Sequence, residues 1–236
     1  MYEKSAELYD TVYLNMGKDY DAEAKRVHAL ADKYKKTDGN TLLDVACGTG
    51  LHAGHLAEFY RVEGLDIDTG MLAVARRKHP GIPFHRGDMR RFDLRRQFDV
   101  VTCLFSAIGY VRSAAELERA AAAMTRHLKP GGVLIVEPWF SPEDWHTGSV
   151  HASFVDQPEL KIARMNVSGR QGNLSTFTFH FLVGTPEGIR HFTEAHELTL
   201  FTQEEYLDAF RACSLEVIHD HEGLYGRGLY IGLKPL

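Results

Sequence analysis

The chain has few cysteines, and they do not form a pattern. Its 236 residues include three, Cys47, Cys103 and Cys213, an odd number without a disulfide framework. The opening residues, MYEKSAELYD, lack the apolar core of a secretory signal peptide. We therefore expect a reduced, cytoplasmic protein.

Long apolar runs and an excess of positive charge are also absent. The longest apolar stretches, such as GGVLIVEPWF, fall far short of the roughly 20 residues that span a bilayer. A net charge of −5 with no basic stripe argues against binding to a phosphate backbone. Five arginines within residues 86–98 alternate with aspartates, which is typical of a solvated connection. We expect neither a membrane nor a nucleic acid as partner.

Strand-like and helix-like segments alternate through residue 138. Apolar strands are expected at residues 41–46, 61–67, 82–88, 98–105 and 132–138. Helical spacing occurs at residues 21–36, 52–60, 70–79 and 114–129, the last closed by PGG. This alternation predicts a doubly wound α/β fold, in which helices cover both faces of a mostly parallel sheet. A chain of this length fits a single domain, residues 1–236.

The C-terminal third departs from a purely parallel fold. The last two extended runs, LEVIHDH and GLYIGLKP, are separated only by EGLYGR, which is too short for a parallel crossover. We predict an antiparallel C-terminal hairpin. Between residues 139 and 200, three runs alternate apolar and polar residues with turn signals between them. This segment is predicted to be an inserted antiparallel β meander that covers the substrate.

The stretch LLDVACGTG, residues 42–50, carries the main binding signal. In an open α/β sheet, ligands bind beyond the carboxyl ends of the strands, and Gly48 and Gly50 let a ligand approach the backbone. Asp66 ends the next strand, where a carboxylate can accept the hydroxyls of a ribose. Asp44 would repel the diphosphate of a dinucleotide but suits a cationic ligand. These residues favour S-adenosylmethionine, which carries a sulfonium and an α-ammonium.

Several ordered motifs carry a family resemblance. LLDVACGTG, GLDID, GDMRRF, FDVVTCLFSAIGYV and LKPGGVLIVEPWF resemble the successive motifs of class I S-adenosylmethionine-dependent methyltransferases. MYE, ELYD, GKDY, FSAIGY, EPWF, LTLF and GRGLYIG are similar to the N,N-dimethyltransferases that complete dTDP-3-amino-3,6-dideoxyhexoses of the desosamine and mycaminose type. In EPWFSPE this chain has a single aromatic after Trp139, where those enzymes tend to carry another. The resemblance implies N,N-dimethylation of a dTDP-linked amino-dideoxysugar and suggests a homodimer.

The resemblance also implies a set of cofactor-binding residues. The loop from Asp44 to Gly50 would hold the methionine part together with Tyr9, and Asp66 would hold the ribose. Ile67 would lie beside the adenine, on which Asp88 and Met89 would close. The full set is Tyr9, Asp44, Ala46, Cys47, Gly48, Gly50, Asp66, Ile67, Asp88 and Met89.

The acceptor side is implied in the same way. Tyr2 and Tyr110 match positions near the amino group, where a hydroxyl can orient the amine without acting as a strong base. Lys18, Tyr20 and Arg227 resemble positions that meet the diphosphate. Glu137 and Trp139 end the fifth strand and would form the floor of the sugar pocket.

The thirteen histidines do not indicate a metal site. The pairs His52/His55 and His219/His221 share faces but lack partners at a recognised ligand spacing, so we expect no metal. His180 and His191 either line the acceptor cavity or pair across neighbouring strands. Two alternatives to the aminosugar enzyme stay open. One is a methyltransferase for another small amine, hydroxyl or carboxylate, and the other is a catalytically silent S-adenosylmethionine-binding protein.

Overall fold

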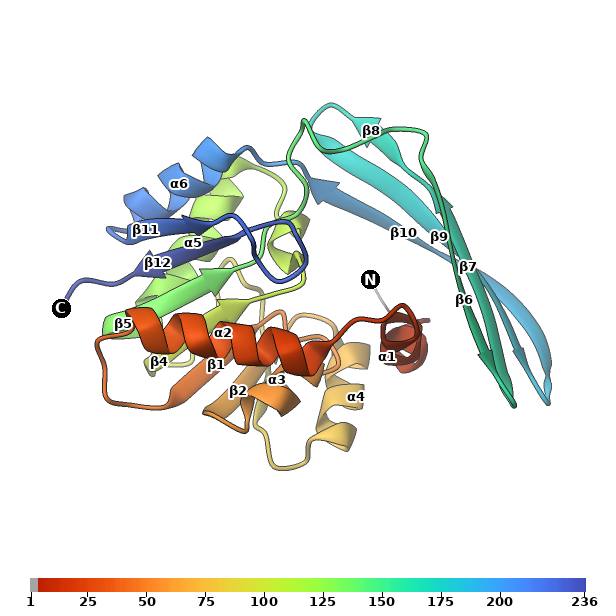
Figure 1. The fold of residues 1–236 in the computed structure, drawn as a ribbon, viewed down its shortest axis with the longest axis horizontal. Coiled ribbons are helices and arrows are strands. Elements are labelled where there is room, and N and C mark those ends of the chain that lie inside the picture. The colour runs from red at the N-terminus through yellow and green to blue at the C-terminus, as the bar shows by residue number, and fades with distance from the viewer. Residues whose placement is uncertain (1–3) are drawn as a thin grey trace.

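The computed structural model describes residues 4–236, which form two sheets of different kinds (Figure 1). The larger sheet has the strand order β11-β12-β5-β4-β1-β2-β3. Its strands are β1 (Thr41–Val45), β2 (Arg61–Asp66), β3 (Phe84–Arg86), β4 (Phe98–Cys103), β5 (Leu128–Val136), β11 (Glu216–Asp220) and β12 (Leu229–Leu233). All neighbours are parallel except the two pairs that β12 makes, with β5 and β11. The predicted mostly parallel sheet with an antiparallel C-terminal hairpin is confirmed.

Helices cover both faces of this sheet. They are α2 (Tyr20–Tyr34), α3 (Leu51–Leu56), α4 (Thr69–Lys78), α5 (Ala114–Arg126) and α6 (Gln203–Ala212), with a 3-10 helix η1 (Ala107–Tyr110) after β4. The first helix, α1 (Ala6–Asn15), instead packs between α4 and the second sheet. Leu42 packs with α2, α3 and α4, whereas the adjacent Leu43 packs with α5 and α6. Successive side chains of a strand point to opposite faces, so a strand covered on both faces needs apolar residues at every position.

Side-chain caps fix the helix starts. Asp68 accepts hydrogen bonds from the backbone of Gly70 and Met71 and so begins α4 directly after β2. Thr202 and Glu205 form a reciprocal capping box at the start of α6. These contacts satisfy backbone N–H groups that have no partner within a helix.

The start of β5 differs from the prediction. The helix was expected to reach residue 129, but α5 ends at Arg126 and β5 begins at Leu128. Leu128 pairs with Phe98, and the next pair along the ladder joins Val133 to Val100. Pro130 and Gly131 lie in the irregularity between these pairs, where Gly131 has a φ of 76°. The proline therefore interrupts the strand rather than preceding it.

The second sheet is antiparallel and lies across α1 from the larger one (Figure 1). Its strands, in the order β10-β9-β7-β6, are β6 (Val150–Gln157), β7 (Leu160–Val167), β9 (Leu174–Thr185) and β10 (Gly188–Thr199), and β8 (Gly169–Gln171) pairs with β9. The predicted meander is confirmed, although sequence patterning missed β6. Leu8 and Val12 of α1 pack on Phe181 and Val183 of β9. This apolar contact joins the N-terminal helix to the second sheet.

Candidate active site

The loop between β1 and α3 lies at the carboxyl edge of the larger sheet. Gly48 has a φ of 56°, and a Cβ built there would meet no atom within 4 Å. Gly50 has a φ of 80°, and its Cβ would lie 3.0 Å from the ring of Phe84. Both positions favour glycine for their backbone conformation, but only Gly48 borders open space. A ligand can therefore approach the backbone at Gly48, whereas Gly50 is needed for packing.

Asp44 is the last residue but one of β1, beneath this loop, and it is buried. Its Oδ1 accepts a 2.9 Å hydrogen bond from the hydroxyl of Thr102, while its Oδ2 has no hydrogen-bond partner within residues 4–236. Burial raises the pKa of Asp44 to about 6, against the opposing effects of His52 and Thr102. A buried carboxylate oxygen without a partner lowers the stability of the fold unless a bound ligand supplies a hydrogen bond or an opposite charge. The position therefore suits a cationic ligand.

Asp66 ends β2 on the other side of the loop. Its carboxylate accepts 2.8 Å hydrogen bonds from the backbone N–H groups of Gly48 and Asp68. Burial raises the pKa of Asp66 although these bonds oppose the change. The Asp66 side chain thus holds the glycine loop in place and lines the cavity beside it.

Two cavities meet at Ala46, whose φ of 59° turns the chain between them. The larger, of about 240 Å³, is lined among others by Asp66, Ile67, Asp88, Met89 and Tyr110. The smaller, of about 40 Å³, is lined among others by Tyr9, Tyr20, Asp44, Cys47 and Gly48. The cavities separate the residues predicted for the adenosine from those predicted for the methionine part. The contact of each residue with the cofactor stays a prediction.

Asp88 is part of a charged pair at the wall of the larger cavity. Arg90 donates to both carboxylate oxygens, at 2.9 and 2.7 Å, and this bonding lowers the pKa of Asp88. Arg90 also donates to Glu116 of α5. Each carboxylate oxygen has more than one lone-pair site, so Asp88 can still accept a hydrogen bond from an adenine amine while it is paired with Arg90. Arg90 therefore fixes the orientation of the predicted adenine contact.

A buried ion cluster lies beneath the smaller cavity. Lys18 donates to both oxygens of Glu23 at 2.6 and 2.7 Å, and His52 contacts Glu23 at 2.7 Å. Burial alone would raise the pKa of Glu23, but the bonds from His52 and Lys18 outweigh it and lower the pKa. Lys18 also lies 3.9 Å from the ring centre of Phe105. Lys18 is thus already neutralised within the protein, and sequence reasoning missed Glu23 and His52 as its partners.

The hydroxyl of Tyr20 lies near the same cluster. It is buried and has no hydrogen-bond partner within the described chain. Burial raises the pKa of Tyr20 far above its ordinary value. The ring of Tyr20 packs edge-on against His52. Tyr20 therefore stays a protonated donor whose predicted contact with a diphosphate is untested.

The buried Glu137 and the partly buried Arg227 form a second ion pair at the end of β5. Arg227 donates to Glu137 at 2.8 Å, and the backbone N–H of Phe105 donates to the other carboxylate oxygen at 2.6 Å. The guanidinium also lies 5.7 Å from the ring centre of Trp139. The structure thus brings together three residues predicted for the substrate side, Glu137, Trp139 and Arg227.

Aromatic rings extend this wall to the second sheet. The indole N–H of Trp139 donates to Ser175 of β9 at 2.9 Å. Trp139 also contacts the rings of Phe140, Trp145 and Phe177. The single aromatic residue after Trp139 in the sequence is therefore supplemented by two rings from elsewhere in the chain.

Tyr110 ends η1, and its hydroxyl lies 2.9 Å from Nδ1 of His196 on β10. Sequence reasoning did not select His196, because nothing in the spacing of the two residues places β10 against η1. Tyr9 projects from α1 toward Phe105, with ring centres 6.4 Å apart. Tyr2 lies outside the described residues.

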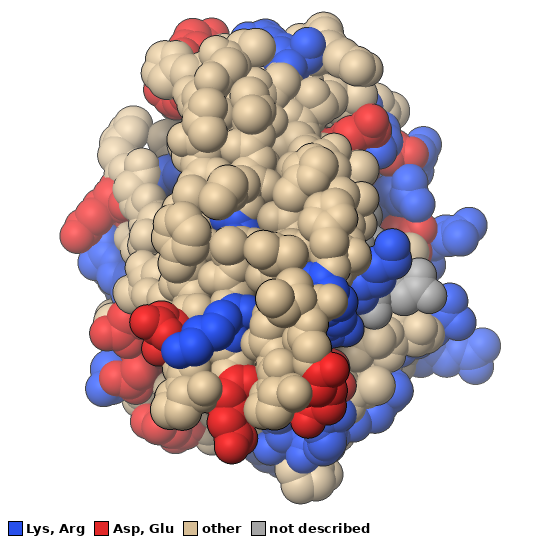
Figure 2. Space-filling view, turned by 90° about the vertical axis from the view of Figure 1, so that its right-hand side faces the viewer, with Lys and Arg blue, Asp and Glu red and all other residues tan. Residues whose placement is uncertain are grey.

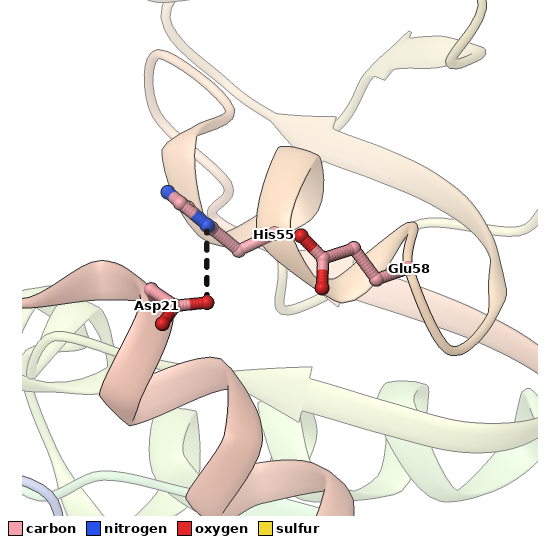
Figure 3. A group of neighbouring side chains, drawn as sticks. All are labelled: Asp21, His55 and Glu58. Atoms are coloured by element: carbon pink, nitrogen blue, oxygen red, sulfur yellow. Dashed lines mark ion pairs between the residues drawn. The ribbon is translucent and has the colours of Figure 1, made fainter.

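The histidine pairs proposed from sequence have different surroundings. His52 is buried on Glu23, whereas His55 is half-exposed. Figure 3 shows His55 with Asp21 and Glu58, whose ligand-type atoms lie within 4.8 Å of one another. Asp21 is already paired with Lys25 at 2.6 Å, which is typical of a surface ion cluster.

His180 and His191 lie on neighbouring strands of the second sheet. Their rings stack 5.8 Å apart, and both side chains are exposed. This arrangement agrees with cross-strand partners rather than with residues of the acceptor cavity.

Comparison with known proteins agrees with this geometry. Residues 42–132 match the family described as a methyltransferase domain. The chain is 45% identical over 230 residues to the dTDP-3-amino-3,6-dideoxy-alpha-D-glucopyranose N,N-dimethyltransferase of Streptomyces fradiae, covering 97% of this chain and 90% of the relative. The chain belongs to the family of dTDP-aminosugar N,N-dimethyltransferases.

Two solved structures of similar enzymes support the assignment of the fold and of the cofactor. DesVI of Streptomyces venezuelae is 42% identical and superposes with a TM-score of 0.94 over 99% of both chains. The amino pentose methyltransferase CalS10 of Micromonospora echinaspora was solved with S-adenosylmethionine bound, and it is 42% identical with a TM-score of 0.88 over 96% of both chains. The protein is an S-adenosylmethionine-dependent N-methyltransferase with the class I fold. The unpartnered Oδ2 of Asp44 and the open backbone at Gly48 fit this cofactor.

Proposed function

We propose that this dTDP-aminosugar N,N-dimethyltransferase adds two methyl groups in succession to the amino group of one dTDP-linked amino-dideoxysugar. The observation that carries the proposal is the buried Asp44 oxygen without a partner, which lies beside open backbone in a chain similar to such enzymes over nearly its whole length. S-adenosylmethionine, when bound, supplies an electrophilic methyl group. The protein then has to bind the acceptor, orient its amino group toward that methyl group and exclude water from the site.

The chemistry places simple demands on the residues. The neutral amine nitrogen forms the new bond to the methyl carbon while the carbon–sulfur bond breaks, and the resulting ammonium releases one proton to water. An alkyl ammonium has a pKa of about 10, so the site has to favour the neutral amine. Alignment of the nitrogen with the methyl carbon supplies much of the catalysis in such an in-line displacement. Tyr110 lines the cavity and is the described hydroxyl that we assign to orienting the amine.

The acceptor binds, in this proposal, against the wall formed by Trp139, Glu137 and Arg227. The indole of Trp139 offers an apolar surface to a deoxygenated sugar, and Arg227 has a second face for phosphate oxygens. Its Nε is buried and has no hydrogen-bond partner within the described chain, although Nη2 is committed to Glu137. Residues 139–200, which include the second sheet, would then cover the sugar.

Mass spectrometry of the purified enzyme with a dTDP-linked amino-dideoxysugar tests the proposal. A monomethylated species should rise and fall before a dimethylated product accumulates. The corresponding free amino sugar should react poorly, because it lacks the binding energy of the nucleotide. Product that stops at one methyl group, or equal efficiency on the free sugar, would contradict the proposal.

A methyltransferase for another small amine is the second candidate. The observation that favours it is that Lys18 and Arg227 are both ion-paired, with Glu23 and Glu137, and so have less charge to offer a diphosphate. A panel of free and nucleotide-linked amines distinguishes the two. Turnover without a nucleotide would select this second candidate.

We also propose that two copies associate through the outer face of the second sheet. Figure 2 shows this face, where uncharged side chains cover most of the centre. The strand register places the exposed Val150, Phe154, Met165, Leu182 and Ile189 on it. An uncharged apolar face can meet its own copy about a twofold axis without repulsion. Sedimentation should give a dimer for the wild type and a monomer for Leu182→Asp, whereas a monomeric wild type would refute the pairing.

No helix within residues 4–236 is long and apolar enough to cross a membrane. The three cysteines are free in the structure. We propose the cytoplasm as the location of the enzyme, on the basis of these free thiols.

A further inference from the structure

The hydrogen bond between Tyr110 and His196 joins the two sheets beside the cofactor cavity. Tyr110 belongs to η1, directly after β4, and His196 belongs to β10. Oη of Tyr110 lies 2.9 Å from Nδ1 of His196. Tyr110 also lines the larger cavity, so this bond sets the direction of the hydroxyl of a cavity-lining residue.

His196 is held rigidly in a dry environment. Only 2% of the residue is exposed, and its ring stacks on Phe177 and meets Phe179 edge-on, with ring centres 5.4 and 5.2 Å away. Burial, assisted by the charge of Arg164, lowers the pKa of His196 to about 4. The imidazole is therefore neutral near pH 7, with one ring nitrogen that donates and one that accepts.

The chemistry of the two groups fixes which one donates. A phenolic O–H, with an ordinary pKa near 10, is a far stronger acid than the N–H of a neutral imidazole. The phenol is consequently the better donor and the unprotonated imidazole nitrogen the better acceptor. In this direction, Nδ1 accepts and the ring proton resides on Nε2.

We propose that His196 is a positioning residue that accepts the hydroxyl proton of Tyr110, so that the Tyr110 oxygen presents lone pairs to an N–H of the acceptor amine. The inference rests on the proposed function for its amine. An amine held through its N–H keeps its nitrogen lone pair for the methyl carbon. If the bond ran the other way, the tyrosine would donate to that lone pair and block the reaction.

The same arrangement explains why the reaction stops after two methyl groups. A primary amine offers two N–H groups and a monomethylated amine offers one, so the Tyr110 oxygen can hold both acceptors. A dimethylated amine has no N–H when neutral and loses this contact. The number of methyl groups is then set by the hydrogen bond rather than by the size of the cavity alone.

Kinetics of four variants test the role of His196. His196→Phe keeps an aromatic ring but removes the acceptor, and we expect kcat to fall roughly tenfold to hundredfold with KM and S-adenosylmethionine affinity within about twofold of wild type. Tyr110→Phe should give a similar loss, and the double variant should be no slower than Tyr110→Phe alone. His196→Asn, whose amide oxygen can replace Nδ1, should recover part of kcat. Additive losses in the double variant would overturn the proposal.

A matched control and a second readout separate this proposal from the proposed function. His191→Phe replaces a histidine of the same strand whose side chain is exposed, and it should leave kcat unchanged. Nitrogen-15 NMR of the unliganded protein should show His196 as the Nε2–H tautomer with an accepting Nδ1, and Tyr110→Phe should change the Nδ1 signal. An Nδ1–H tautomer refutes the inference even if no aminosugar is methylated. Absence of turnover with the Nε2–H tautomer would refute the proposed function alone.

Discussion

Replacing Asp44 with asparagine should make the ligand-free protein more stable while weakening its hold on the cofactor. The carboxylate is buried with one oxygen bonded to Thr102 and the other without a partner in the described chain. Its pKa of about 6 lies above the ordinary value of 3.8, so the folded state holds the proton more tightly than the unfolded chain does. The charge therefore opposes folding increasingly as the pH rises, by about 3 kcal/mol at pH 8.

The asparagine removes this charge but still buries a polar group, which has its own free-energy cost. Its amide oxygen can still accept from Thr102, while its NH₂ group would be buried in place of Oδ2 at a cost of about 1–3 kcal/mol. A net gain of about 1 kcal/mol at pH 8 is the expected result. Since wild-type Asp44 is mostly protonated at pH 5, the advantage of the variant over wild type should shrink by about 1.4 kcal/mol between pH 8 and pH 5.

Thermal unfolding of both proteins at the two pH values measures this difference. For a chain of this size, the change corresponds to about 3–6 °C in the gap between the two melting temperatures. Titration calorimetry at pH 8 should show S-adenosylmethionine affinity reduced roughly tenfold to hundredfold in the variant. Wild-type affinity should itself weaken below pH 6 as Asp44 takes up a proton. A gap in melting temperature that stays constant with pH would refute the electrostatic reasoning.

Three further predictions concern other charged groups. Asp66→Ala should weaken S-adenosylmethionine binding by about 1–3 kcal/mol in calorimetry, because the carboxylate also orders the glycine loop; unchanged affinity would remove it from the site. Arg227→Ala should raise KM for the nucleotide-linked sugar and also lower the melting temperature, since it leaves the buried Glu137 unpaired. Adding Glu137→Gln to this variant should restore the melting temperature but not KM. Asp99→Asn should cost about 2 kcal/mol in urea unfolding at pH 7, because the bonds from Thr41 and Lys129 that lower its pKa are weakened. The cost should shrink only as the pH falls below 3.8 toward the lowered pKa of Asp99, and a cost that does not change at all below pH 3.8 would contradict this cause.

The larger sheet could be predicted from sequence because its signals are local. A strand buried on both faces requires an apolar residue at nearly every position, as in FDVVTCLF, and a short connection such as EGLYGR permits only an antiparallel return. The outer strand β6 was harder to predict, since Val150 and Phe154 face outward, Val155 is its one buried residue and the rest of the strand is mostly exposed. The irregularity at Gly131 depends on the register with β4 and has no local signature.

The site was predictable where a residue ends a strand and not where two distant segments meet. Asp44 lies near the end of the buried strand β1 and Asp66 is the last residue of β2, and their shared edge follows from parallel pairing. The contacts of His196 with Tyr110 and of Glu23 with His52 join segments that no spacing relates. Tertiary packing alone creates these pairs. Sequence motifs therefore predicted the residues that bind the cofactor, while the structure was needed for the groups that set charge and orientation around them.

The distribution of charge at the ligand edge gives a physical reason for its cofactor preference. Lys18 is paired with Glu23, and Arg227 is paired with Glu137. Asp44 has no ion pair among residues 4–236, although it is buried like Lys18, Glu23 and Glu137. A dinucleotide at the glycine loop would bring a diphosphate close to this carboxylate, and like charges in a partly dry site repel strongly. A sulfonium and an ammonium would instead supply the missing positive charge, so we expect the feature that weakens the ligand-free protein to favour S-adenosylmethionine.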